Sequence, residues 1–579
     1  MIKETSIVGT ANLFTNAENY LQASTKKQCT DETAWFNQFR VRITNKINEK
    51  IFFPLYCDNN GAPISSIRIN VAMLILKDSK GWSYVELREQ CMANIFVRRA
   101  LGLYNLDDPI PARSTFFDFL SRLSKWKENT NEDLLDKLFK EITKEQMLEF
   151  SVMGNKIRMD STTLGSNIAW LSRYELVHET IRYAYSHSRS RSRALINSVL
   201  SEEDINVIKE IRSETGDKVS YRSTNPQLKS KLIRLGTLMH NIIRNIQATS
   251  TKQIEVLRKV FFEQYEIVDG KVVLLPVSRL LPTNIQSPYD IEGDYHRKNK
   301  KKVKGYTVNP TETCHPDNAF DLITDVIVAP ATVHDSKHLI PAVEATEEVT
   351  GQKVETINTD SNYHSQDNQE ECAERGIDLV LSGLGGGKPK YDIELLENGE
   401  LSVTNLITQE TTIAIKINRK DPAAPPAWKI INENGNETRF EQKKLDTCNL
   451  RRMIKNRSKE EINLRNNVEA TISQLMYPFS NDKSVYRGLI RHVIWARARC
   501  MGINCCRITR YMLILKELFK SYVQILVILC KMRVLTSFLF NIFNIFTRLM
   551  TIFWKFWFKN IFWSVFFPKK QNICINVSL

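Results

Sequence analysis

Residues 321–383 alternate between extended and helical patterns, and this alternation constrains the fold more than any other feature of the chain. DLITDVIVAP (321–330), KVETINTD (353–360) and IDLVLSG (377–383) are short runs typical of strands. Residues 335–349 and 365–376, which lie between them, have apolar and capping residues at helical positions. Strands that alternate with helices form a sheet with right-handed crossovers. The sequence therefore predicts an α/β core.

Two aspartates stand at the ends of predicted strands. SVMGNKIRMD (151–160) has the pattern of a strand that ends in Asp160, and the strand at 353–360 ends in Asp360. Sheets of the α/β class place their functional sites at the carboxyl ends of strands. We therefore expect the two carboxylates to belong to one site.

A third acid, Glu469, lies on a helix predicted over residues 458–476. Ser458 begins this helix with a capping-box spacing, and Arg465 and Glu469 stand one turn apart beside its apolar stripe. Spacing alone favours a surface ion pair between these two residues. Together with the two aspartates, however, Glu469 completes the carboxylate set that phosphoryl transfer uses, with two Mg²⁺ ions ~4 Å apart. Both interpretations remain open at this stage.

The regions around this core differ in character. Residues 1–150 are predicted to be helical, with Arg98 and Arg99 near a helix end; a small DNA-binding bundle and a solvated helical domain fit equally well. Residues 161–300 form a helical insertion, and residues 384–455 form a β-rich insertion. A basic run that includes Lys300, Lys301 and Lys302 fits either contacts with phosphates or a solvated linker.

Charge and cysteine content narrow the class of protein. The net charge is +15, but residues 511–579 supply eight of these charges, with nine Lys or Arg and the single acid Glu517. The rest of the chain is only mildly basic, so binding of a polyanion is plausible without being demanded. The eleven cysteines form no Cys-x-x-Cys pair, which argues against a zinc ribbon and a secreted disulfide framework. We expect a cytoplasmic protein.

Several short motifs, taken in order, resemble one family. RMDSTTL (158–164), TDSNYHS (359–365) and RNNVEATISQL (465–475) resemble the segments that bear the three acids of bacterial insertion-sequence transposases of the DDE class. GYTVNPTETC (305–314), TVHDSKHLIPAVE (332–344) and YRGL (486–489) resemble the segments between and after them. GAPISSIRINVAMLIL (61–76) through ARSTFFDFLSRL (112–123) resembles the helical region that precedes the catalytic domain. Each motif is short, and their order and spacing are jointly specific.

The resemblance implies a fold, an activity and roles for residues. It implies an RNase H-like catalytic domain over 151–510, preceded by a helical DNA-binding domain over 1–150. Asp160, Asp360 and Glu469 would bind two Mg²⁺ or Mn²⁺ ions. Arg465 would orient Glu469 or touch the transposon end, and Tyr363 would lie near the DNA backbone.

The implied partners are double-stranded DNA, both transposon terminal inverted repeats and target DNA, and a second copy of the chain in a dimer on that DNA. The insertions would embrace the DNA outside the sheet. Water, and then the freed 3′-hydroxyl, would attack phosphodiester bonds without a covalent link between protein and DNA.

Two positions depart from the family pattern. Ile462 stands where related enzymes often carry Tyr, and Met476 stands where they often carry a Lys that contacts the transposon end. The second departure puts that contact, and with it the activity of this copy, in doubt.

The segment 511–579 is apolar and basic, and two interpretations apply to it. Arg548 and Lys555 interrupt its most apolar part, so it lacks the ~20 uncharged residues of a membrane span; contact with a membrane surface is the less favoured interpretation. We favour a non-native extension, because Phe, Ile, Asn and Lys all have AT-rich codons. Two rival functions also stay open: a nuclease without strand transfer, and an inactive DNA-binding relic with a membrane-seeking tail.

Overall fold

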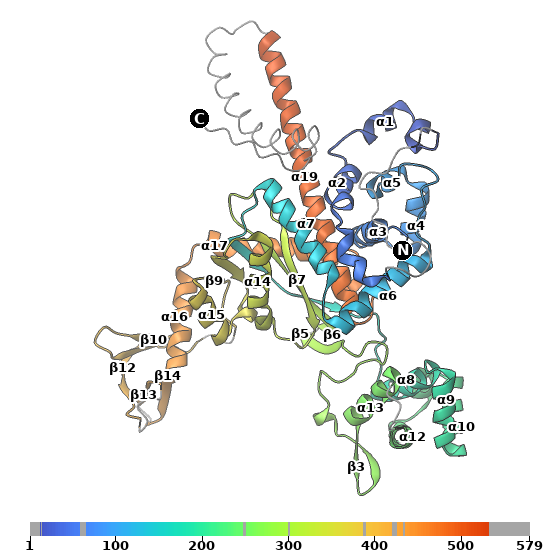
Figure 1. Ribbon diagram of the computed structural model, residues 1–579. Coiled ribbons are helices and arrows are strands. Elements are labelled where there is room, and N and C mark those ends of the chain that lie inside the picture. Colours follow the sequence, from blue (N-terminus) through green and yellow to red (C-terminus); the bar gives the residue numbers. More distant parts are fainter. Residues whose placement is uncertain are drawn as a thin grey trace.

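The computed structural model describes residues 12, 14–57, 65–246, 251–298, 301–385, 389–419, 425–431 and 435–531 (Figure 1). A mixed sheet lies at the centre, with helices from the N-terminal region and the long C-terminal helix packed beside it. The two insertions extend from this body in different directions. The predicted α/β core with a mixed sheet and a helical N-terminal region is confirmed.

The central sheet is built around one long strand, β6 (Lys301–Thr313). Antiparallel to it run β7 (Ile323–Pro330) and β5 (Asp294–Lys298), and also β1 (Lys156–Met159) and β2 (Thr162–Gly165). Beyond β1, the strands β8 (Thr356–Thr359) and β9 (Asp378–Leu381) follow in parallel. The core order is therefore β7, β6, β1, β8, β9. The expectation that the chain turns helical directly after Asp160 is wrong, because Thr162–Gly165 pair with β6 before the helices begin.

Two helices of the predicted alternation cover this sheet. They are α14 (Leu339–Thr350) and α15 (Gln366–Arg375), and α15 begins where the side chain of Ser365 accepts a hydrogen bond from the backbone N–H of Asn368. The first helix starts later than predicted, after a 3-10 turn over Asp335–His338. Pro341, which has no backbone N–H to donate, lies in the first turn of α14, where the loss is tolerated.

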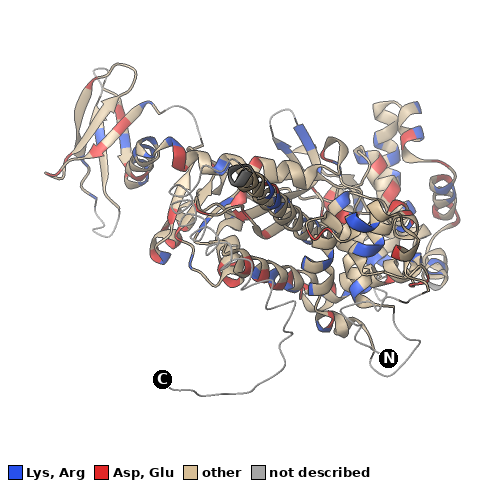
Figure 2. Ribbon diagram, turned by 90° about the horizontal axis from the view of Figure 1, so that it is seen from above, with Lys and Arg blue, Asp and Glu red and all other residues tan. Residues whose placement is uncertain are grey.

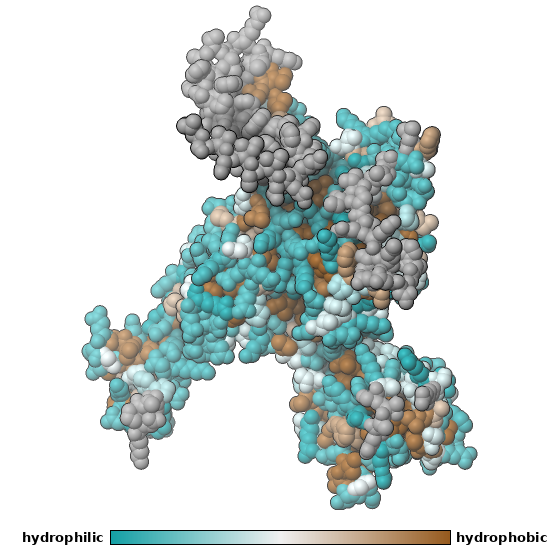
Figure 3. All heavy atoms as spheres, in the orientation of Figure 1, coloured by the Kyte–Doolittle hydropathy of each residue, from teal (hydrophilic) through white to brown (hydrophobic). Residues whose placement is uncertain are grey.

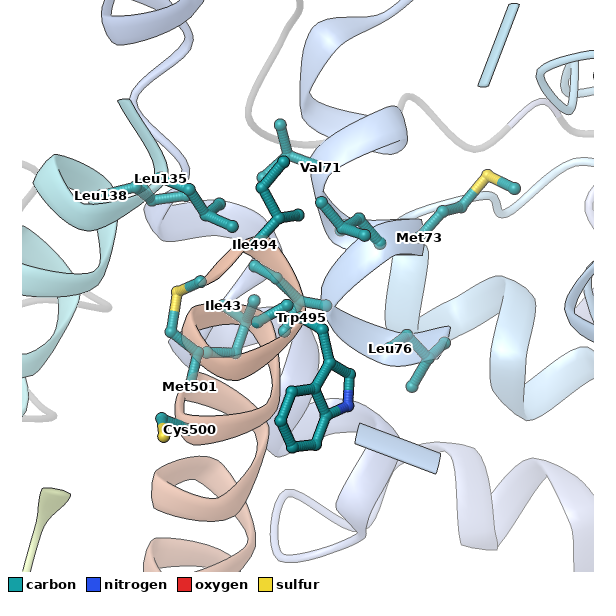
Figure 4. Close-up of a cluster of buried hydrophobic side chains, with 14 of the residues drawn as sticks. Ile43, Val71, Met73, Leu76, Leu135, Leu138, Ile494, Trp495, Cys500 and Met501 are labelled. Carbon is teal, nitrogen blue, oxygen red and sulfur yellow. The ribbon is translucent and has the colours of Figure 1, made fainter. Parts of the chain in front are cut away.

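The N-terminal helices do not form a separate core. They are α1 (Ala23–Cys29), α2 (Trp35–Arg42), α3 (Ile67–Lys80), α4 (Tyr84–Ala93), α5 (Ile95–Leu101), α6 (Arg113–Thr130) and α7 (Leu134–Phe150). Side chains of α3 and α7 surround Ile494, Trp495 and Met501 of α19 (Leu489–Lys531), as Figure 4 shows. Residues of β6 and β7 join the same cluster. The N-terminal region is thereby fixed to the sheet.

Each insertion has a core of its own. The helical insertion comprises α8 (Arg173–Ser186), α9 (Ser190–Val199), α10 (Glu202–Ser213), α11 (Gly216–Arg222), α12 (Asn225–Asn245) and α13 (Lys252–Gln264), followed by the hairpin of β3 (Tyr265–Val268) and β4 (Lys271–Leu274). The β-rich insertion is a five-stranded antiparallel sheet: β10 (Tyr391–Leu395), β11 (Leu401–Asn405), β12 (Thr411–Lys416), β13 (Ala427–Ile431) and β14 (Glu437–Glu441). One face of this sheet packs on α16 (Gln442–Asn456).

The helix predicted over 458–476 is interrupted. It consists of α17 (Lys459–Asn463), a 3-10 turn over Leu464–Asn467, and α18 (Val468–Met476). Asparagine is a poor helix former, and three of the residues at 463–467 are Asn. In addition, the Arg158 guanidinium donates to the carbonyl of Leu464 at 3.2 Å, a carbonyl that a continuous helix would use itself.

The long helix α19 runs from the core outward (Figure 1). Its outer part carries exposed hydrophobic side chains at Leu513, Ile514, Leu518, Phe519, Val523, Ile525 and Val527. Figure 3 shows hydrophobic atoms near the outer end of this helix. Within the described residues, no helix combines the length and the apolar character needed to cross a membrane. The part of the predicted tail from residue 532 onward lies outside the described residues.

Candidate active site

Asp160 and Asp360 come together at the carboxyl ends of neighbouring strands. Lys156, Ile157 and Arg158 of β1 are paired with Thr356, Ile357 and Asn358 of β8, in parallel. The same register carried forward brings Asp160 opposite Asp360, one residue beyond each strand. β1 lies in the middle of the sheet, where it pairs with β6 on one side and with β8 on the other. The sequence placed both acids at strand ends, and the topology makes those ends neighbours.

Asp160 is a buried carboxylate with two hydrogen-bond partners. The residue is 7% exposed; Oδ1 accepts from the backbone N–H of Ser161 at 2.8 Å, and Oδ2 accepts from Nη2 of Arg465 at 2.6 Å. Burial raises the pKa of the Asp160 carboxyl above its usual value, and the charge of Asp360 adds to the rise. The Arg465 guanidinium and the Ser161 N–H oppose it.

Asp360 begins a 3-10 turn, Ser361–Tyr363, directly after β8. Its Oδ1 accepts from the backbone N–H of Asn362 at 2.9 Å, and its Oδ2 accepts from the Asn362 side chain at 3.1 Å. Asp360 is half-buried. The local turn therefore holds this carboxylate at the strand end without the help of a distant residue.

Glu469 lies in the first turn of α18 and is exposed. In the described part of the chain, no group of three or more His, Cys, Asp or Glu side chains is arranged to hold a metal ion. The role of Glu469 as the third carboxylate therefore stays a prediction. The two aspartates are of the right chemical type for a divalent cation, because carboxylate oxygens are the ligands that Mg²⁺ and Mn²⁺ prefer.

The structure corrects the expected partner of Arg465. Its guanidinium lies on Asp160, and among the described residues it forms no ion pair with Glu469. Arg465 belongs to the 3-10 turn before α18, which presents it to the end of β1. Spacing favoured a surface pair with Glu469, and the resemblance implied an orienting role on Glu469; the structure instead shows a bond to Asp160, far away in the chain.

Tyr363 is also not where the resemblance placed it. It is fully buried, and its hydroxyl donates to Oδ1 of Asn309 at 2.8 Å. Burial, together with the charges of Asp335, Asp160 and Asp360, raises its pKa well above the usual value, so the hydroxyl stays protonated. In this conformation Tyr363 lies inside the protein near the acids, and the DNA backbone cannot reach its side chain.

The basic residues proposed for DNA binding have different surroundings. Arg98 is buried, and its guanidinium donates to the carbonyls of Cys91 and Asn105, so it serves the fold. Arg99 donates to Asn37 and pairs with Glu18. Lys302 is exposed on the β5–β6 hairpin, where Figure 2 shows several cations, and Lys301 beside it pairs with Asp482. Lys300 lies outside the described residues.

A buried charge network beneath the site was not predicted. The side chain of Glu312, which is 0% exposed, accepts from Arg158 at 2.7 Å, from Thr471 at 2.7 Å and from Arg507 at 2.7 Å. These partners come from β1, α18 and α19. The alternating pattern of β6 gave no signal for it, since Glu312 lies among residues that are all buried.

Met476, one of the two departures from the family pattern, faces inward. It is 7% exposed and belongs to the large hydrophobic cluster formed with α19. A methionine fits this position because its flexible apolar side chain fills space in a core. The side chain of Met476 is thus turned into the core in this structure, and nothing here supports a contact between it and DNA.

A mixed sheet with paired aspartates at adjacent strand ends defines an α/β protein whose site suits metal-dependent chemistry. Residues 29–122 match the family described as Transposase domain (DUF772), and residues 267–505 match the family described as Transposase DDE domain. Together the matches span more than half of the chain. The chain belongs to the DDE transposases of insertion sequences, as its motifs predicted.

The second match contains Asp360, Arg465 and Glu469, whereas Asp160 lies outside both matches. This family implies an RNase H-like fold, DNA as the substrate and polynucleotidyl transferase activity. No curated protein and no solved structure matches the chain.

Proposed function

We propose that this transposase cuts DNA at the ends of its element in a metal-dependent reaction and joins the freed 3′-hydroxyl to target DNA. The observation that carries the proposal is the pairing of Asp160 and Asp360 at adjacent strand ends in a chain of this family. Glu469 is proposed as the third carboxylate. A divalent cation, Mg²⁺ or Mn²⁺, bound by these acids would stabilise charge on the attacking and leaving oxygens, and two such ions are proposed.

The protein's own residues supply the rest. Asp160 is held by Ser161 and Arg465, so one carboxylate is fixed before any substrate arrives. A cation bound through both oxygens of Asp160 would displace the Arg465 guanidinium from Oδ2, while the Ser161 N–H would keep its bond to Oδ1. Once free, this guanidinium is a cation beside the site that suits a phosphate of the transposon end.

Double-stranded DNA is proposed to lie along the basic β5–β6 hairpin. Arg297 stands opposite Lys302 in this hairpin, and Lys298 stands opposite Lys301. Several basic residues therefore follow one another along this hairpin, and a row of phosphates would suit such a surface. We also propose that two copies act together on the DNA, in the bacterial nucleoid.

The test uses a supercoiled plasmid that carries the gene of this chain with its native flanking DNA, so that the ends need not be known. The full chain with Mg²⁺ or Mn²⁺ is expected to give double-strand breaks at the element ends and joined products. Asp160→Ala, Asp360→Ala and Glu469→Ala are each expected to abolish both. Cleavage that survives all three changes would refute the proposal.

The same assay separates the rival functions. A nuclease without strand transfer would cut the plasmid but would not join a pre-cut end to target DNA. An inactive relic would bind the DNA without cutting it in either metal.

A further inference from the structure

Ser161 joins two carboxylates that come from distant parts of the chain. Its backbone N–H donates to Oδ1 of Asp160 at 2.8 Å, and its hydroxyl donates to Oδ2 of Asp335 at 2.8 Å. The first bond requires that the peptide after Asp160 point back at the carboxylate. The second bond holds the side chain of Ser161 and so limits how that peptide can turn.

Asp335 is itself held in a frame. It begins the 3-10 turn Asp335–His338, and the side chain of Asn368 donates to the carbonyl of Ser336 in this turn at 2.8 Å. The same Asn368 amide donates to the carbonyl of Tyr363 at 2.8 Å. Tyr363 ends the turn that Asp360 begins. Hydrogen bonds therefore link the segments that follow β1, β7 and β8 into one continuous frame around the two aspartates.

We infer that Asp335 is a positioning residue, which fixes Asp160 through Ser161 in the geometry that binds a divalent cation. The inference rests on the proposed function, because it concerns the carboxylate assigned to the metal. Residues that hold a metal ligand in place typically change metal affinity or activity 10–100-fold when they are removed, on the order of the effect expected here. Asp335 acts through its hydrogen bond and not through direct contact with the metal.

The substitutions separate the hydrogen bond from the charge. Asp335→Ala and Ser161→Ala both break the link, whereas Asp335→Asn keeps an oxygen that can accept from the Ser161 hydroxyl. Ser161→Thr keeps the hydroxyl. The matched control is Thr332→Val, which removes the hydrogen bond from Thr332 to Asp294 in the same loop without touching Ser161.

Binding of Mn²⁺ to the full chain is measured from the electron paramagnetic resonance signal of free Mn²⁺, and plasmid cleavage is measured over a range of Mn²⁺ concentrations. Asp335→Ala and Ser161→Ala are expected to weaken Mn²⁺ binding about 10-fold. They are expected to raise the Mn²⁺ concentration for half-maximal cleavage equally, with little change at saturation. Asp335→Asn, Ser161→Thr and Thr332→Val are expected to stay close to wild type.

Unchanged Mn²⁺ affinity in both alanine variants would overturn the inference. So would an Asp335→Asn variant as weak as Asp335→Ala, because charge would then matter and the hydrogen bond would not. If Asp335→Ala fails to fold, Ser161→Ala decides. A wild-type chain that binds Mn²⁺ but cuts no DNA contradicts the proposed function alone, and the binding measurement still judges Asp335. A wild-type chain that binds no Mn²⁺ overturns both.

Discussion

At the scale of single residues, burial favours the neutral form of the Asp160 carboxyl, whereas binding of a cation would use its charged form. Its side chain, which is 10% exposed, has lost most of its hydration, and one guanidinium and one backbone N–H compensate for only part of the loss. The pKa of Asp160 is raised because the effect of burial exceeds that of these two partners. The charged form that would bind a cation is therefore unfavourable for the folded protein at neutral pH.

Asp160→Asn is expected to raise the melting temperature at pH 7. The pKa of this carboxyl is higher in the folded than in the unfolded chain, so its contribution to stability is present below the unfolded pKa of about 3.9 and is lost as pH rises through the folded pKa. A neutral amide escapes that loss. In thermal unfolding, the melting temperature of Asp160→Asn should exceed that of wild type at pH 7, and this difference should shrink toward pH 4.

The exposed residue Asp107 provides the control, since Asp107→Asn should leave the melting temperature at pH 7 close to that of wild type. An Asp160→Asn variant that melts lower than wild type at pH 7 would contradict this account.

At the scale of elements, α18 owes its place to the network around Glu312. Its Thr471 hydroxyl, Arg158 of β1 and Arg507 of α19 all converge on this one carboxylate. The network fixes α18 against the sheet, and the helix carries Glu469 at its exposed start. The 3-10 turn Leu464–Asn467, which directly precedes α18, holds Arg465.

Glu312→Ala is expected to destabilise the fold by about 3–5 kcal/mol, because it leaves guanidinium groups buried without their shared carboxylate. Thr471→Val removes the two hydrogen bonds of the Thr471 hydroxyl, to Glu312 and from Arg507, and keeps both arginine bonds to Glu312, so about 2 kcal/mol is expected. Urea unfolding of the two variants measures the difference. Equal losses of stability would show that Glu312 does not organise the network.

At the scale of the whole molecule, a single hydrophobic core joins the N-terminal helices, the sheet and α19, while the two insertions have cores of their own. The basic β5–β6 hairpin is continuous with this body, because β6 runs from the exposed lysines to the strand pair with β1. A phosphate bound at the hairpin is therefore connected through one strand to the end of β1 that bears Asp160.

Lys301→Ala combined with Lys302→Ala is expected to weaken DNA binding and to flatten its dependence on salt. Each lysine that no longer neutralises a phosphate lowers the slope of log K against log salt by about 0.9. Fluorescence anisotropy over a range of salt concentrations gives this slope. Lys353→Ala is the control and should leave the slope unchanged, because this exposed lysine precedes β8, at the opposite end of that strand from Asp360. An unaltered slope in the double variant would remove the hairpin from the DNA surface.

A chain that ends at Lys531 is expected to keep its melting temperature, solubility and DNA cleavage. The packing of α19 on the core includes Tyr511 and Met512, and Lys516 reaches Asp31, all before this point. Differential scanning calorimetry, yield in the soluble fraction and the plasmid assay measure the three properties. Loss of solubility or cleavage would contradict the interpretation of the tail as a non-native extension, and binding of the full chain alone to lipid vesicles would favour the membrane interpretation.

The sequence by itself determined the alternation of strands and helices, the two aspartates at strand ends, the two insertions and the family. These follow from periodicity, capping and the order of short motifs, which are local properties of the chain. The helix at 366–375, with Ser365 as its cap and Gly376 after its end, is a direct example. The 3-10 turn before α14 was missed, and so was the break before α18, where a guanidinium from another strand takes a helix carbonyl.

Only the tertiary structure decided which residues meet at the site. Arg465 and Asp160 are 305 positions apart, and no spacing rule pairs them. Tyr363 and Arg98 looked suited to DNA in sequence, and both are buried because the sheet and the N-terminal helices enclose them. Asp335 reaches Ser161 because the turn after β7 lies beside the end of β1. The place of Glu469 beside the aspartates stays a prediction, since it depends on how α18 is oriented against the sheet and not on the sequence around it.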